Sequence, residues 1–200
     1  MNDTQLENFI YCCLSFASNA HFDDERYIKN ILGKPLSEKT FLDTIMENYK
    51  IANNMHFGVC FTMTCWAYHL LYTMGIDSGY YLLETIEKDT GYPNYVLLYE
   101  YNGEYHICDL TLQVIRCEEA IKELFHISRY PDQYSEEDKQ KALAILSDSK
   151  YICCSLEEYA KEYNLGFVVL AEGIDDKRIF TDIPEMFIGE FLKNQSSKRG

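Results

Sequence analysis

Near the start of the chain, apolar residues recur at the spacing of one helix face. The capping-box pattern Thr4-x-x-Glu7 stands in front of them and predicts a helix over residues 4–18. After a polar segment, Ser37 is expected to cap a second helix, which we expect the asparagine pair at 53–54 to end. The chain therefore begins with a helical part.

A much more apolar stretch follows at residues 58–75, where apolar side chains lie nearly all round a helix. Gly75 is a helix stop, so the pattern predicts a buried central helix that ends there. Several threonines and a histidine interrupt the apolar run, and it is too short to span a membrane.

Strand-forming residues then replace the helical pattern, first at 78–87 and then on both sides of the dipeptide Asn102-Gly103. This dipeptide between strand formers predicts a two-residue hairpin with a type I′ turn. Such a turn pairs residues whose numbers sum to 205, so that Leu98 lies opposite Ile107.

Side chains alternate along a strand, so the pairing also predicts which hairpin residues share a face. Three apolar members make one face suited to packing on the buried helix, and Asn94 and Asp109 lie diagonally at its end, about 7 Å apart. This predicted face consists of Asn94, Val96, Leu98, Ile107 and Asp109.

The opposite hairpin face is rich in tyrosine and also carries His106 and Cys108. Tyrosines in a sheet are most often core or surface residues, but an exposed tyrosine face is also typical of a protein-binding surface. The tyrosines in question are Tyr95, Tyr99 and Tyr101.

The rest of the chain predicts three short helices within residues 116–163, two of them opened by Ser135 and Ser155. A strand at 167–172 and a final helix from Pro184 follow. The expected fold is α+β in one domain over residues 1–193, with a disordered polar tail at 194–200.

Composition narrows the functional classes. The 200 residues carry a net charge of −14, which argues against nucleic acid and against an anionic membrane surface as partners. The N-terminus lacks the basic start of a signal peptide, so we expect a cytoplasmic protein whose eight cysteines are reduced thiols. No zinc-ligand spacing, calcium loop or phosphate loop is present, and we expect neither a metal nor a cofactor.

Cys60 is the candidate nucleophile, because it stands two residues after Gly58 at the start of the apolar helix. Backbone N–H groups and the helix dipole favour a thiolate there. A small core cysteine at a crowded helix start is the alternative interpretation, and it is the commoner one for this feature alone.

Taken together, Gly58-Val59-Cys60, Gly75-Ile76, the Gly103 turn and Asp109-Leu110-Thr111 resemble the core of the transglutaminase-like superfamily, a branch of the papain-like thiol fold. The resemblance covers residues 57–112. It implies a buried helix carrying Cys60 on an antiparallel sheet, with extra helices at both ends. In that family a histidine moves the thiol proton, and an aspartate, here Asp109, orients it.

Asn94 stands at the histidine position of that pattern, and an amide has no titratable nitrogen near neutral pH. His56 is the one plausible local substitute base, and the upstream amide of Asn54 is a candidate oxyanion donor. A solvated loop histidine and a turn asparagine are the more ordinary interpretations of these two residues.

Two functions follow from the resemblance. In the first, the site Cys60–Asn94–Asp109 is degenerate, with weak or no thiol hydrolase or acyl-transfer activity, and the protein binds a peptide or protein partner. In the second, it is an active cysteine peptidase, amidase or transglutaminase in which Cys60 attacks an amide and a non-standard base such as His56 takes the proton. The oligomeric state is left open.

Overall fold

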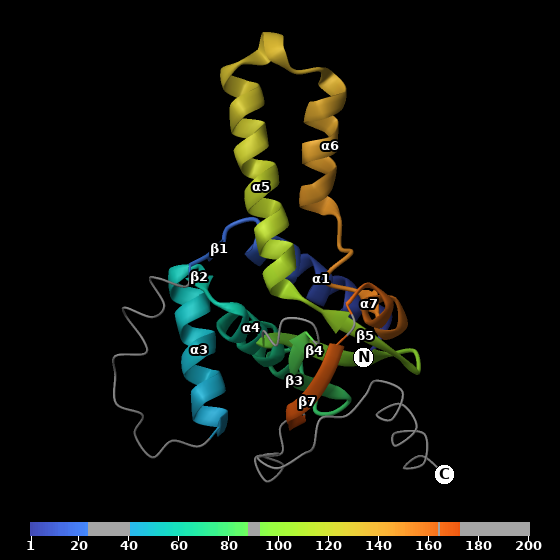
Figure 1. Cartoon of the computed structure of the whole chain (residues 1–200). Helices are drawn as coiled ribbons and strands as arrows, with labels where there is room; N and C mark the ends of the chain where they lie inside the picture. The colour runs from blue at the N-terminus through green and yellow to red at the C-terminus, as the bar shows by residue number, and fades with distance from the viewer. Residues whose placement is uncertain (24–40, 88–92, 164, 173–200) are drawn as a thin grey trace.

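A computed structural model describes residues 1–23, 41–87, 93–163 and 165–172 of the chain (Figure 1). The predictions of a Ser37 cap, of a helix from Pro184 and of a tail at 194–200 lie outside the described residues. Within the described part, helices pack around a sheet whose strands differ in length, which agrees with the expected α+β class.

Five strands form the main sheet in the order β6-β5-β4-β3-β7, with antiparallel pairing throughout. A separate short parallel pair joins β1 and β2 just before the apolar helix. The strands are β1 (His21–Phe22), β2 (Phe57–Gly58), β3 (Tyr80–Glu87), β4 (Pro93–Tyr101), β5 (Glu104–Cys108), β6 (Cys154–Ser155) and β7 (Leu165–Glu172).

In chain order, α1, α3 and α4 precede the first strand of the main sheet, and α5, α6 and α7 lie between its later strands. A pair of them, α5 and α6, projects from the body as a long helical hairpin (Figure 1). The helices are α1 (Asp3–Ala17), α3 (Phe41–Met55), α4 (Cys60–Thr73), α5 (Leu110–Arg129), α6 (Glu136–Ser147) and α7 (Leu156–Glu162), with a short 3-10 turn η2 at Pro131–Gln133.

The hairpin between β4 and β5 confirms the predicted register. Leu98 pairs with Ile107, and both turn residues, Asn102 and Gly103, have φ values of 51° and 81° that a type I′ turn requires. The ladder ends at Leu97 opposite Cys108, so the expected pair between Val96 and Asp109 does not form. Asp109 instead leaves the sheet and caps the next helix.

The predicted assignment of hairpin faces to their packing partners was wrong. Val96, Leu98 and Ile107 do share a face, but they pack with α7, in one cluster with Leu156 and Tyr159. Alternation along a strand shows which residues lie together, and it does not show on which side a helix lies.

The apolar helix α4 packs on the opposite face, the one predicted to be an outer tyrosine surface. The Tyr68 and Tyr80 rings meet at 4.8 Å between centroids, and the Phe61 and Tyr95 rings at 5.0 Å. Tyr99 is only 1% exposed, because α1 covers it as well. Helices therefore cover both faces of the hairpin, and of the three tyrosines Tyr99 is buried while Tyr95 and Tyr101 are partly buried.

Helix boundaries differ from the sequence prediction at three places. The capping box of α1 is formed by Asn2 and Gln5, two residues earlier than the predicted Thr4 and Glu7. The helix α3 continues to Met55, through the asparagine pair expected to end it. The helix α5 begins at Leu110, because the Asp109 carboxylate accepts a hydrogen bond from the Leu112 N–H and provides a cap.

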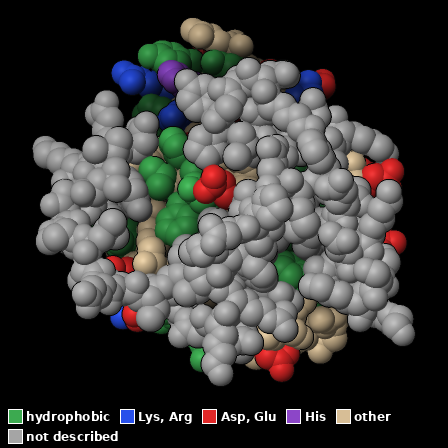
Figure 2. Space-filling model, turned by 60° about the horizontal axis from the view of Figure 1, so that its bottom comes forward, with side chains coloured by type: hydrophobic (Ala, Val, Ile, Leu, Met, Phe, Trp, Pro, Cys, Tyr) green, Lys and Arg blue, Asp and Glu red, His purple; other side chains and the backbone are tan. Residues whose placement is uncertain are grey.

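The central position of α4 rests on its all-round apolar sequence. Figure 2 shows the face that lies at the bottom of Figure 1. Near the centre of that face the described side chains are apolar, and an acidic side chain lies beside them. Nine residues of α4 are buried, and Leu71 among them has no exposed surface. A helix without a polar side can only be accommodated between other elements.

We predict that Leu71→Ala lowers the free energy of unfolding by about 2–5 kcal/mol, because it removes buried apolar surface and leaves a cavity. Leu143→Ala is the matched control, since Leu143 is 41% exposed on α6 and its loss should cost about 0.5 kcal/mol or less. Denaturant titration measures both. Equal midpoints for the two variants would show that α4 is peripheral.

Candidate functional site

Cys60 is the first residue of α4, where the sequence pattern placed it. The approach to it requires a glycine, because a Cβ at Gly58 would lie 2.7 Å from the Thr62 Cβ. Thr62 cannot easily move, since it is fully buried and its hydroxyl donates to the Asn48 side chain over 3.1 Å. The glycine thus lets β2 turn directly into the helix that carries the thiol.

The Cys60 sulfur is half-buried and receives backbone hydrogen bonds, which lower its pKa, from the N–H groups of Phe61 and Tyr95. Burial has the larger effect and raises the pKa above its usual range, and the negative charge of Asp109 acts in the same direction. The expected acidification at the helix start is therefore outweighed. The thiol at this site is mainly protonated at neutral pH.

The start of α4 contacts β4 at Tyr95, the residue that follows Asn94. The β4–β5 register ends at Leu97 opposite Cys108, and α4 contacts the backbone of β4 just beyond that point, at Tyr95. The Thr64 hydroxyl donates to the Tyr95 carbonyl over 2.7 Å, and the Tyr95 N–H interacts with the Cys60 sulfur. The thiol thus contacts the backbone of the residue next to Asn94.

Asn94 and Asp109 are brought together as predicted. The Asn94 amide Nδ2 donates to the Asp109 Oδ2 over 3.0 Å, across the open end of the hairpin. A side-chain nitrogen therefore occupies the place from which a ring N–H would bind this carboxylate. Unlike an imidazole, this nitrogen has no lone pair available to accept the thiol proton.

Tyr159 on α7 completes the site, and the sequence analysis did not find it. Its hydroxyl donates to the same Asp109 Oδ2 over 2.8 Å, and the ring is 3% exposed. The apolar spacing of Leu156, Tyr159 and Tyr163 could have shown that this helix face is buried. No local pattern shows that the hydroxyl reaches a residue 50 positions earlier.

Asp109 itself is completely buried. Burial raises the pKa of its carboxyl group, and the hydrogen bonds from Leu112, Tyr159 and Asn94 lower it again in part. The carboxylate is thus already held by two side chains and a helix N-terminus. Asp109 thus holds elements of the fold together as well as orienting the residue at position 94.

The five histidines all lie in the described part, and each ring contacts a group other than Cys60. His56, the predicted substitute base, has an exposed position with φ 51°, and its ring lies 6.4 Å from that of Phe16. The structure therefore does not place it on the thiol. The other ring contacts are His21 with Glu118, His69 with Tyr49, His106 with Cys153 and His126 with Phe125.

Asn54, the predicted oxyanion donor, is exposed within α3. The asparagines that do meet α4 are its neighbours in that helix. Asn48 accepts from Thr62, and Asn53 accepts from the Trp66 indole N–H over 3.5 Å. The structure thus supports neither the oxyanion role nor the turn interpretation of Asn54, because the residue is part of the helix.

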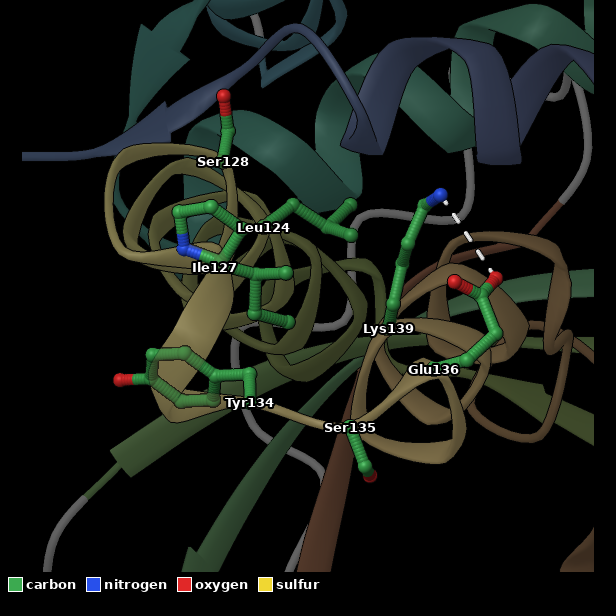
Figure 3. A pocket seen from close by; sticks show the side chains of 8 residues that line it. Leu124, Ile127, Ser128, Tyr134, Ser135, Glu136 and Lys139 are labelled. Atoms are coloured by element: carbon green, nitrogen blue, oxygen red, sulfur yellow. Dashed lines mark ion pairs between the residues drawn. The ribbon is translucent and has the colours of Figure 1, made fainter.

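A pocket of about 390 Å³ opens elsewhere, near the tip of the hairpin of α5 and α6 (Figure 3). Leu124 and Ile127 line it from α5, and Lys139 from α6 pairs with Glu136 over 3.6 Å at its rim. Leu124 is about 21 Å along α5 from Leu110. The pocket is thus separate from Cys60, and its lining residues include no cysteine.

Among the described residues, no three His, Cys, Asp or Glu side chains are arranged to hold a metal ion. In the same part of the chain, no helix is both long and apolar enough to cross a membrane. Comparison with known proteins finds no matching family model, no matching curated protein and no matching solved structure.

We predict that Tyr159→Phe lowers the free energy of unfolding by about 1–3 kcal/mol at pH 7, because the buried Asp109 carboxylate loses a donor. The pKa of Asp109 is higher in the native state than in the unfolded chain, so the native state binds the proton more tightly. The resulting contribution to the free energy of unfolding is present at low pH and is lost as pH rises through the raised pKa. The tyrosine hydroxyl opposes that loss by stabilising the carboxylate. Its removal should therefore cost most above that pKa and least below it.

Chemical denaturation of wild type and variant at pH 7 and near pH 4 measures the effect. Tyr163→Phe is the control, since the Tyr163 hydroxyl bonds the exposed Glu162 over 3.3 Å. A cost for Tyr159→Phe that is the same at both pH values would show that the hydroxyl does not act through the Asp109 charge.

Proposed function

We propose that this chain is a transglutaminase-like domain that keeps the frame of a thiol site without turning over amides, and that it acts by binding a peptide or protein partner. The proposal combines the resemblance of residues 57–112 with the geometry around Cys60. One observation carries it, namely the 3.0 Å hydrogen bond from the Asn94 amide to Asp109.

Catalysis by a thiol needs a group that takes the proton and later returns it to the leaving group. Asn94 stands at the position where the resemblance expects that group and is hydrogen-bonded to the carboxylate, but its amide cannot perform that exchange. Burial raises the pKa of Cys60, which disfavours a preformed thiolate. These two facts support binding rather than turnover.

A protein or peptide fits the remaining features better than a small charged ligand. The chain carries a net charge of −14, which favours a partner with basic residues through long-range attraction. We place this activity in the cytoplasm, where the free thiols of all eight cysteines would persist.

We predict that Asn94→His lowers the pKa of Cys60, because an imidazolium beside a thiolate stabilises it and Asp109 can hold the ring. Alkylation of Cys60 by iodoacetamide at pH 6 should become about tenfold faster for each unit by which the pKa falls. Peptide mapping by mass spectrometry follows Cys60 separately from the other thiols. Wild type should show little hydrolysis or amine transfer on peptide amides.

Asn54→His is the matched control, because it places an imidazole on the exposed side of α3. It should leave the Cys60 rate unchanged. The proposal fails if wild type already cleaves or transfers an amide through Cys60 and Asn94→Ala leaves that rate intact. The active-enzyme alternative would then hold, and its base would have to be found elsewhere.

A further inference from the structure

A second thiol and an imidazole meet on the far side of the hairpin from Asn94. The Cys153 Sγ lies 3.8 Å from His106 Nδ1, within hydrogen-bond distance for sulfur. His106 is fixed in β5, where it pairs with Ser155 of β6. Cys153 is fixed by its own backbone N–H, which donates to the Ser149 carbonyl over 3.0 Å. The contact is thus set by two backbone elements.

The rings around His106 hold it in this orientation. Tyr99 stacks on it at 5.7 Å between centroids and 24° between planes, and Tyr101 covers it at 6.1 Å. The Tyr99 hydroxyl donates to the Ile152 carbonyl, beside Cys153. Burial lowers the pKa of His106 more than the nearby Glu104 and Glu158 raise it. The ring is consequently neutral near pH 7 and has a nitrogen that accepts a proton.

Exposure separates this thiol from most of the others. Cys153 is half-buried, as are Cys12 and Cys60, whereas the remaining five cysteines are buried. Among the three accessible thiols, Cys153 is the one for which the structure records a histidine contact. Its chemistry therefore does not depend on the site around Cys60.

We propose that Cys153 and His106 form a second thiol site, which takes up small disulfides as a reversible modification. The observation behind it is the thiol–imidazole contact together with the accessibility of the sulfur. The proposal goes beyond the binding function proposed above, and it does not require it.

The reaction is a thiol–disulfide exchange in which all atoms are accounted for. The Cys153 S–H proton moves to His106 Nδ1, and the sulfur attacks one sulfur of the small disulfide. The S–S bond of that disulfide breaks as the new S–S bond to Cys153 forms. The leaving thiolate takes the proton from His106, which returns to its neutral state. The protein thiol is oxidised, and half of the small disulfide is reduced.

The experiment treats the full chain with 2-hydroxyethyl disulfide at pH 7 and follows each cysteine by peptide mapping. Cys153 should form the mixed disulfide at least about tenfold faster than Cys12, in the range that a positioned proton acceptor supplies. His106→Gln should remove that advantage, whereas His126→Gln should leave it unchanged, because the His126 ring lies against Phe125 on α5. Added thiol should release the modification.

The comparison of Cys153 with Cys12 is made within the wild-type chain, so it stands even if His106→Gln fails to fold. Equal rates for the two thiols would overturn the proposal, and so would a folded His106→Gln chain with an unchanged Cys153 rate. Because no partner takes part in this experiment, a failure at Cys153 leaves the proposed binding function unaffected.

Discussion

The buried residue Asp109 connects four separate segments of this molecule through hydrogen bonds. It has no exposed surface, so it must obtain its hydrogen bonds from the protein. Asn94 of β4, Tyr159 of α7 and the Leu112 N–H at the start of α5 supply them. Its own backbone N–H donates to the Tyr151 carbonyl over 2.7 Å. One residue thereby joins a strand, two helices and the segment leading to β6.

This constraint explains why an amide is well suited to position 94. The carboxylate needs a donor there, and Asn94 supplies one without adding a second titrating group to a closed environment. A histidine would meet the same geometric need and would also bring a proton that exchanges near neutral pH. The structural and the catalytic requirements at this position are therefore separable, and the chain satisfies the structural one.

Local patterns predicted the elements well, and they predicted the relations between elements poorly. The Asn102-Gly103 turn determined the register, because a two-residue turn allows one pairing. The alternation of side chains then grouped Val96 with Leu98 correctly. Both faces of the sheet are covered by other elements and carry apolar side chains, so the polarity of the side chains could not show which face packs against α4. Tyr159 was missed for a related reason. Its partner lies in another element, and only the tertiary fold brings the two together.

Two opposing effects act on the pKa of Cys60. The start of a helix directs N–H groups at the sulfur, which is the feature that suggests a thiolate. The same position lies beneath neighbouring elements and near the buried Asp109, and both surroundings disfavour a negative charge. A helix start acidifies a thiol where water or a cation also reaches it. The β4 group that contacts the sulfur is the Tyr95 N–H, whose effect is smaller than that of burial, and a cation introduced at position 94 would oppose both burial and the charge of Asp109.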